Sequence, residues 1–280
     1  MNIANVLTAY STQDGDGVNI SRIPGFDGKY LDPFLMIDEL KSDDESDYIG
    51  GFPPHPHRGI ETFTYIIKGG FEHKDQMGNK KAIKAGDVQW MSTGKGVMHS
   101  EMPLSDTQDG LHGFQIWINM PSAEKMRDPR YQDTTEQPTP AVTNEEGVVF
   151  TALAGNWQFE NHTLSASLQS LAAEAVLADV TIPQGKCVQL APLKQKKVMV
   201  YVHTGELITT DGQVLVTGKL AILKPGSEIN LQAKQHAGVL ILAGNPLSQP
   251  IAHMGPFVMT TQEELKQAVS DYQSGKFGSI

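Results

Sequence analysis

The sequence has a single cysteine and no long hydrophobic run, and each of these absences excludes a class of protein. One cysteine, Cys187, cannot form a disulfide within the chain, so the fold does not depend on a disulfide framework. No stretch approaches the about 18 consecutive apolar residues that a membrane-spanning helix requires. The N-terminus has neither the basic segment nor the apolar core of a secretion signal. We therefore expect a cytoplasmic protein without membrane association.

Basic residues are too few for a nucleic-acid-binding surface. Lys and Arg number 22 against 32 Asp and Glu, which gives a net charge of −10 at pH 7. Phosphate backbones bind to positively charged surfaces, so this balance argues against direct binding of nucleic acid. Hydrophobic residues make up 39% of the 280 residues, and 27 glycines and 16 prolines are typical of a turn-rich globular fold.

Short hydrophobic runs broken by Gly, Pro and Asp predict a fold of many strands. The clearest runs are residues 61–67, 87–91 and 114–119 in the first half, and 198–203 and 239–242 in the second. The stretch 121–146 is polar, contains four prolines and interrupts this pattern. We place a boundary within it, which gives domains 1–132 and 133–280. Thr261 and Glu264 have the spacing of a capping box, so a helix is expected from there to Gly275.

The two strand-rich halves form a weak internal repeat. Residues 61–69 align without a gap on 197–205, and residues 86–94 align on 218–226. Many short strands with regular turn signals favour small antiparallel barrels or jelly rolls. We therefore expect an all-β fold of two tandem β-barrels followed by a C-terminal helix.

Three histidines and a glutamate of the first half form a candidate metal site. His55 and His57 are two residues apart, as are His99 and Glu101, and residues two apart in a strand point to the same face. Two such pairs facing one another supply four ligands, a set that favours Fe(II) and also accommodates Mn, Ni, Cu or Zn. The alternative is an incidental or surface pair, since short motifs also occur by chance. The second pair at matching spacing makes the metal site the better interpretation.

Glu61 is a further candidate, and the repeat supplies a comparison for all five residues. Glu61 follows His57 by four residues, so in a regular strand it faces the same way and can orient a ligand or replace one. The residues of the second half that correspond to the five candidates are Ala191, Leu193, Lys197, Leu231 and Ala233. None of them is a metal ligand of this type, so only the first half should bind metal.

The residues around these histidines resemble the pirin family of the cupin superfamily. The similarity is carried by residues 51–65, 86–91, 94–103 and 113–119, and it continues in residues 244–247 and 255–259 near the C-terminus. It implies a bicupin, a chain of two cupin-type barrels, with one Fe(II) in the first barrel. The residues that match the family's ligands are His55, His57, His99 and Glu101.

The resemblance implies two activities. Some members of the family are quercetin 2,3-dioxygenases, which open the flavonol heterocycle with O2 and release carbon monoxide, so the partners would be a small aromatic substrate and O2. Others are metal-dependent regulators that bind a transcription factor or a metabolic enzyme without turnover. A third interpretation is a cupin that acts on another small molecule.

For a dioxygenase, the sequence offers a base and a set of aromatic pocket residues. Glu101 is the first candidate to take the proton of the flavonol hydroxyl, and Glu61 is the second. Apolar residues near the motifs can line a substrate pocket or fill the barrel core, which uses the same residue types. These pocket candidates are Phe34, Phe52, Met91, Phe114 and Trp117.

Overall fold

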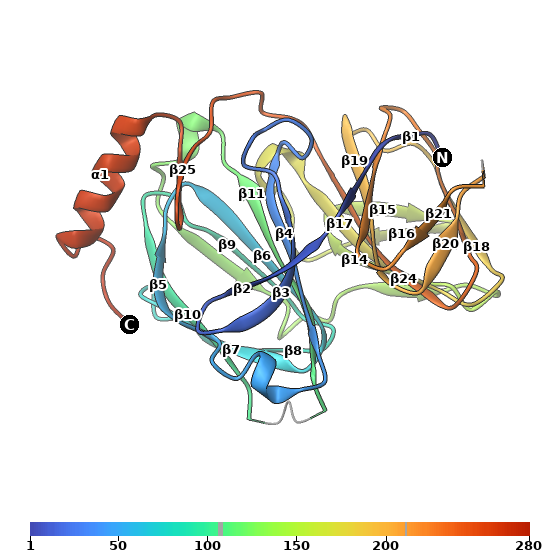
Figure 1. Ribbon diagram of the computed structural model, residues 1–280, viewed down its shortest axis with the longest axis horizontal. Helices are drawn as coiled ribbons and strands as arrows, with labels where there is room; N and C mark the ends of the chain where they lie inside the picture. Colours follow the sequence, from blue (N-terminus) through green and yellow to red (C-terminus); the bar gives the residue numbers. More distant parts are fainter. Residues whose placement is uncertain (106–108, 211) are drawn as a thin grey trace. The chain divides into compact units, whose positions relative to one another are not determined.

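The computed structural model describes residues 1–105, 109–210 and 212–280 (Figure 1). Strands predominate in them, and the one α-helix of this part of the chain is α1 (Gln262–Gln273), as the sequence predicts. The chain divides into two compact units. We call them the motif unit (Ser11–Pro138 and Leu247–Ile280) and the companion unit (Met1–Tyr10 and Thr139–Pro246). None of the helices in the described residues is both long and apolar enough to cross a membrane.

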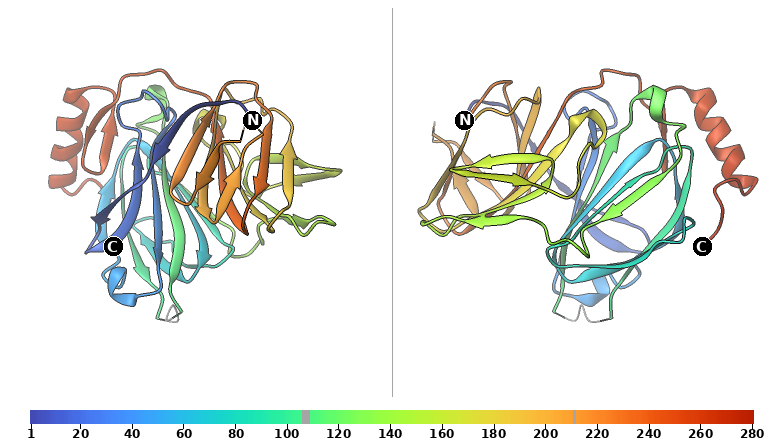
Figure 2. Two further views of the ribbon diagram at one scale, coloured as in Figure 1. Left: turned by 45° about the vertical axis from the view of Figure 1, so that its right-hand side comes forward. Right: turned by 180° about the vertical axis from the view of Figure 1, so that it is seen from behind.

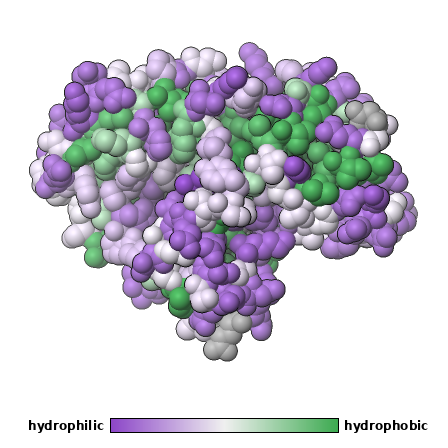
Figure 3. Space-filling model, viewed as in Figure 1, coloured by the Kyte–Doolittle hydropathy of each residue, from purple (hydrophilic) through white to green (hydrophobic). Residues whose placement is uncertain are grey.

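The motif unit is built from two antiparallel sheets. The larger sheet contains, in order, β12 (Arg130–Asp133), β9 (Val88–Ser92), β6 (Ile60–Lys68), β11 (Leu111–Asn119), β4 (Phe34–Ser42), β3 (Val18–Pro24) and β2 (Tyr10–Asp14). The smaller sheet contains β5 (Phe52–His57), β10 (Val97–Pro103), β7 (Gly70–Asp75) and β8 (Lys80–Lys84). A short 3-10 helix, η1 (Glu45–Asp47), lies between β4 and β5 in the chain. The end of the unit with η1, β7 and β8 is largely hydrophilic on the face drawn in Figure 3.

The companion unit repeats this arrangement strand by strand. Its larger sheet contains, in order, β1 (Ile3–Thr8), β22 (Lys219–Leu223), β19 (Lys197–Thr204), β24 (Ala237–Gly244), β17 (Val176–Ile182), β14 (Val149–Ala154) and β13 (Ala141–Thr143). Its smaller sheet contains β18 (Cys187–Leu190), β23 (Ile229–Ala233), β20 (Glu206–Ile208) and β21 (Val214–Val216), and β15 (Asn156–Phe159) pairs with β16 (His162–Ser165). A 3-10 turn, η3 (Ala172–Glu174), precedes β17.

Strand register confirms the internal repeat. Phe63 lies opposite Trp90, and the residues aligned with them, Met199 and Ile222, also lie opposite each other. The two copies therefore use corresponding strands in the same order, which agrees with the two tandem cupin-type units that the sequence predicts.

The predicted correspondence needs one correction, at β5 and β18. His55 lies opposite His99, whereas Leu231, the residue aligned with His99, lies opposite Val188. His55 and His57 therefore correspond to Val188 and Leu190, three residues before the predicted Ala191 and Leu193. The reason is that the companion unit has a longer connection between β18 and β19 than the motif unit has between β5 and β6, and a gapless alignment cannot allow for it.

The two units also exchange their terminal segments, which the predicted division into 1–132 and 133–280 did not anticipate. β1 pairs with β22 at the edge of the companion sheet, so residues 1–10 belong with the second half of the chain. The crossing point lies between residues 138 and 139, within the predicted linker. That linker is not unstructured, because it contains η2 (Ser122–Glu124), β12 and β13.

The C-terminal segment belongs to the motif unit. α1 lies beside the hairpin of β25 (Ala252–Met254) and β26 (Phe257–Met259), as the left view of Figure 2 shows. Thr261 and Glu264 form the predicted capping box. Leu265 and Ala268 are buried in a cluster that also contains Met98 of β10. Residues more than 140 positions from β10 therefore complete the core behind that strand.

Candidate metal centre and adjoining cavity

The structure brings three of the predicted ligands together. His55 and His57 lie at the end of β5, and His99 lies on β10 directly opposite His55. One ring nitrogen from each of the three lies within 4.8 Å of those of the other two. The ring centroids of His55 and His99 are 4.3 Å apart, and those of His57 and His99 are 4.9 Å apart. His57 and His99 are buried, and His55 is partly exposed.

The hydrogen bonds of these rings leave nitrogen lone pairs free for a metal ion. Nδ1 of His55 lies 2.8 Å from the carbonyl oxygen of Pro53, and Nδ1 of His57 lies 3.3 Å from that of Pro256. A carbonyl oxygen can only accept, so each Nδ1 carries the proton and each Nε2 keeps a lone pair. Both nitrogens of His99 are buried without a hydrogen-bond partner among the described residues. Buried polar atoms are normally paired, so this donor set fits a metal ion.

Burial also keeps two of the rings neutral. Desolvation, followed by the neighbouring His55, lowers the pKa of His57 well below its usual value. Desolvation and the neighbouring histidines do the same to the pKa of His99. A metal ligand must be the neutral imidazole, so no proton has to leave these two rings near pH 7.

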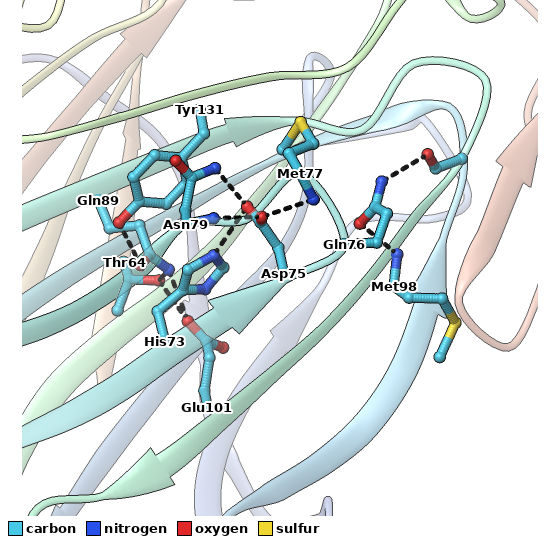
Figure 4. Close-up of polar contacts among 11 residues, drawn as sticks. Thr64, His73, Asp75, Gln76, Met77, Asn79, Gln89, Met98, Glu101 and Tyr131 are labelled. Atoms are coloured by element: carbon cyan, nitrogen blue, oxygen red, sulfur yellow. Dashed lines mark hydrogen bonds and ion pairs between the residues drawn. The ribbon is translucent and has the colours of Figure 1, made fainter. Parts of the chain in front are cut away.

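Glu101, the fourth predicted ligand, lies two residues after His99 on β10 and is held by amide and hydroxyl donors. One of its oxygens, Oε1, accepts from Nε2 of Gln89 at 2.8 Å and from the hydroxyl of Thr64 at 3.2 Å. The other, Oε2, accepts from Nε2 of Gln115 at 2.8 Å. The carboxylate lies within 4.8 Å of nitrogens of His99 and His73. Figure 4 shows Gln89 and Thr64 directed at Glu101, and these donors hold its carboxylate in place.

Glu61 does not belong to this cluster, which corrects the expectation that it faces the same way as His57. Arg58 and Gly59 turn the chain between β5 and β6, with Gly59 at a φ of +81°, so the two residues lie on strands of different sheets. Glu61 is fully buried and accepts from the indole of Trp90 at 2.9 Å and from Arg127 at 2.8 Å. It is a partner of Arg127 and is absent from the potential metal clusters of the described residues.

A cavity of about 630 Å³ opens beside the histidines, and two of the five predicted pocket residues line it. Phe52 and Trp117 lie in its wall, and the indole of Trp117 meets His57 edge to face at 5.0 Å. The other three predicted residues are absent from the wall and are fully buried in the core of the unit; they are Phe34, Met91 and Phe114. Of the two interpretations that the sequence allows, substrate pocket or core, these three residues therefore belong to the core.

Two features of the cavity were missed from the sequence. The first is an aromatic wall in which Phe26 stacks on His253 with ring centroids 3.8 Å apart and planes 5° apart. His253 comes from the C-terminal segment, so nothing in its local sequence connects it with Phe26.

The second missed feature is an ion-paired group in the cavity wall. Arg22 donates to both oxygens of Asp38, at 2.8 and 2.6 Å, and also to Asp14 at 2.5 Å. Burial raises the pKa of Asp38 to about 6, although the Arg22 contacts oppose this. Asp38 also lies opposite Gln115 on β11, the residue that holds Glu101. Cross-strand partners share a face, so Asp38, Gln115 and the metal cluster face the same interior.

His73 on β7 is a further histidine beside the cluster. It lies opposite Glu101 in the register of β7 and β10, and Asp75 lies opposite His99. Its Nε2 lies 3.1 Å from Oδ2 of Asp75, and its ring stacks on Tyr131 with centroids 4.8 Å apart (Figure 4). The sequence signal was the same two-residue spacing used for the other pairs, here His73 and Asp75. From the sequence alone His73 is interpreted as a solvent or core histidine, because only the strand order places β7 next to β10.

A buried lysine fixes the strands around the site. Lys125 is 2% exposed, and its ammonium donates to the carbonyl of Gly59 at 2.7 Å, to Oδ1 of Asn119 at 2.6 Å and to the carbonyl of Val258 at 3.0 Å. Desolvation lowers the pKa of Lys125 to about 7. One side chain thus joins the start of β6, the end of β11 and β26.

Comparison with known families agrees with this architecture. Residues 19–118 match the family model described as Pirin, and residues 177–278 match that described as Pirin C-terminal cupin domain. The chain is 43% identical over 276 residues to a Vibrio cholerae protein whose name gives it provisionally as a quercetin 2,3-dioxygenase. That alignment covers 98% of this chain and 97% of the relative.

Solved structures show the same fold. A quercetin 2,3-dioxygenase from Acinetobacter baumannii is similar with a TM-score of 0.88 and 30% identity, covering 100% of this chain and 99% of that chain. A bacterial pirin from Escherichia coli, solved in complex with nickel(II), is similar with a TM-score of 0.62 and 20% identity, covering 86% of this chain and 100% of that chain. At that identity the second comparison concerns the fold alone.

Proposed function

This chain belongs to the pirin family, and from that premise we propose that it is a metal-dependent dioxygenase that opens flavonol-type phenols such as quercetin with O2. One observation carries the proposal: His99, whose two nitrogens are buried and have no partner in the described part of the chain, lies against His55 and His57 beside a cavity with aromatic residues in its wall. Small-molecule sites are concave and mostly apolar with a few convergent polar groups, and volumes of about 300–1,000 Å³ are usual for them. This cavity has those properties.

We assign the metal to His55, His57, His99 and Glu101. Three neutral imidazoles and one carboxylate suit a divalent first-row ion, and for oxygen chemistry we favour Fe(II) over Mn, Ni, Cu or Zn. When bound, the ion would supply a Lewis acid for the flavonol oxygens and a redox-active centre for O2. In the companion unit the corresponding positions are the apolar residues Val188, Leu190, Leu231 and Ala233, all in a hydrophobic core. We therefore expect one ion per chain.

The cavity walls would orient a flat aromatic substrate. Trp117 and the Phe26–His253 stack offer apolar faces for fused rings, whereas Arg22 and Asp38 offer hydrogen bonds in the same cavity. Arg22 is already paired with Asp38 and Asp14, and one guanidinium with two carboxylates leaves this group net negative. A neutral substrate with hydroxyl donors fits such a wall better than an anion does.

Glu101 is the residue that would take the proton of the flavonol hydroxyl. Its Oε1 already accepts two hydrogen bonds, from Gln89 and Thr64, whereas Oε2 accepts one, from Gln115. A carboxylate oxygen has two lone pairs, so Oε2 keeps one, which can bind the metal or accept the proton but cannot do both at once. A proton held at Oε2 stays next to the substrate that released it.

Oxygen consumption tests this proposal. Protein loaded anaerobically with Fe(II) should consume oxygen when quercetin is added, and His99→Ala, loaded identically, should retain little iron and consume none. Leu231→Ala is the matched control, because Leu231 holds the corresponding position in the companion unit. Loaded parent protein that binds iron yet consumes no oxygen would contradict the dioxygenase. It would leave the alternative of an iron-binding regulator of a transcription factor or metabolic enzyme, to be sought among protein partners.

A further inference from the structure

His73 is fully buried beside the proposed ligands. One of its nitrogens, Nδ1, has no hydrogen-bond partner among the described residues. Five buried side-chain nitrogen or oxygen atoms in those residues lack a partner, and three of the five belong to His73 and His99. Unpaired buried polar atoms are rare and costly, so three in one place indicate a common cause.

The partners of His73 determine which of its nitrogens carries the proton. Asp75 accepts from Nε2 of His73 at 3.1 Å, from the backbone N–H of Met77 at 2.9 Å and from the side-chain amide of Asn79 at 2.7 Å (Figure 4). A carboxylate with these donors is an acceptor, so Nε2 of His73 is protonated. Nδ1 of His73 therefore keeps a lone pair and is one of the unpaired atoms.

His99, by contrast, needs an acceptor for an N–H group. A neutral imidazole that binds a metal through one nitrogen carries a proton on the other, and ligand histidines almost always donate that N–H to an acceptor. In the fully buried His99, an unpaired N–H would be destabilising. His73, His99 and Glu101 have donor atoms within 4.8 Å of one another, and the rings of His73 and His99 are 5.5 Å apart.

We propose that Nδ1 of His73 accepts the remaining N–H of His99 in the metal-loaded protein, so that Asp75, His73 and His99 form a chain that positions the ligand. The inference rests on the proposed assignment of His99 as a ligand. Tyr131 stacks on His73 at 4.8 Å and limits the tilt of its ring. The hydrogen bond between the two rings would require them to rotate towards each other, and hydrogen bonds at such sites commonly tighten when the bound group is present.

The residue of the companion unit that corresponds to His73 supports a role of His73 in the metal cluster. Leu207 lies opposite Ala233 as His73 lies opposite Glu101, and Leu207 is fully buried. Where the ligands are absent, an apolar residue therefore suits the fold at this position. The fold of the companion unit does not need an imidazole at this position, which agrees with a role of His73 in the cluster.

The test is the metal affinity of His73→Leu, which carries the companion unit's residue. Competition with a chelator, with Zn²⁺ as a redox-inert probe, should give a Kd about 10- to 100-fold weaker than that of the parent, the usual effect of losing a partner of a ligand. His73→Gln keeps an acceptor oxygen and should restore part of the loss. His112→Leu is the matched control, since it removes another buried histidine paired with a carboxylate, Glu39, and should leave the Kd unchanged.

A spectroscopic measurement tests whether His73 positions His99 through a hydrogen bond or only contributes to packing. In the ¹⁵N-labelled Zn²⁺ protein, the side-chain N–H of His99 should be protected from exchange, and this signal should disappear in His73→Leu. An unchanged Kd and an unchanged signal in His73→Leu would overturn the proposal. So would metal retention in His55→Ala/His57→Ala that is lost on adding His73→Leu, because His73 would then be a ligand. Failure of the parent to bind Zn²⁺ would instead contradict the ligand assignment, and none of these readouts depends on oxygen chemistry.

Discussion

Gln115→Ile isolates the effect of holding Glu101 in place. Gln115 donates to Oε2 of Glu101 at 2.8 Å, and a hydrogen bond to a charged group contributes about 1.5–3 kcal/mol. Since about 1.4 kcal/mol is a factor of ten in an equilibrium constant, the variant should bind metal about 10- to 150-fold more weakly. Oε1 keeps its bonds from Gln89 and Thr64, so the site should weaken rather than disappear.

The companion unit indicates that Gln115→Ile should not disturb the fold. Gln115 lies opposite Thr64, and the aligned residue of the repeat, Val200, lies opposite the buried Ile241. The fold therefore already tolerates isoleucine at this position, and the unfolding midpoint of the metal-free variant should stay within a few degrees of the parent's. Chelator competition gives the Kd, and thermal unfolding without metal gives the stability. A Kd equal to that of the parent, with normal folding, would refute the role assigned to the Gln115 hydrogen bond.

Three further predictions concern stability, pH and substrate choice. Lys125→Met leaves three buried oxygens without their donor and should lower the free energy of unfolding by about 3–5 kcal/mol in urea titrations; a loss below 1 kcal/mol would contradict this. Because the pKa values of His57 and His99 are lowered, the unfolded chain binds more protons than the folded one below about pH 6.5. The metal-free protein should therefore lose stability on acidification by up to about 2.7 kcal/mol per pH unit, and His99→Ala should halve that slope. Equal slopes would show that His99 is charged in the fold. Asp38→Asn should reduce kcat/KM for quercetin about tenfold through KM while leaving 3-hydroxyflavone, which lacks the other hydroxyls, unaffected; equal losses for both would exclude hydroxyl recognition.

Much of the fold could be predicted from the sequence because its signals are local. Short hydrophobic runs such as 61–67, bounded by turn residues, predict strands, and the spacing of Thr261 and Glu264 predicts the start of α1. The ungapped alignments predict the repeat, and the register of Phe63 on Trp90 and of Met199 on Ile222 confirms it. The prediction that His55 and His57 lie together also depends on a local signal, because a strand places residues two apart on one face.

What the sequence could not reveal depends on which strands become neighbours. Glu61 was expected beside His57, but a turn at Gly59 moves it to another sheet. His73 gains its place only because β7 pairs with β10, and His253 reaches Phe26 from the far end of the chain. The pairing of β1 with the second half of the chain could not be predicted from the sequence either, since an edge strand can pair with any free sheet edge. These features are non-local, and no local spacing encodes them.

The most direct test of the central claim is the stoichiometry of products. Ring opening of a flavonol by one O2 should release one molecule of carbon monoxide for each quercetin and each O2 consumed. Headspace carbon monoxide and dissolved oxygen should be measured together, in Fe(II)-loaded protein and in His99→Ala. We predict equal amounts of carbon monoxide released and oxygen consumed by the parent and neither by the variant. Oxygen consumption without carbon monoxide, or equal carbon monoxide release from His99→Ala, would contradict ring-opening dioxygenation at this site.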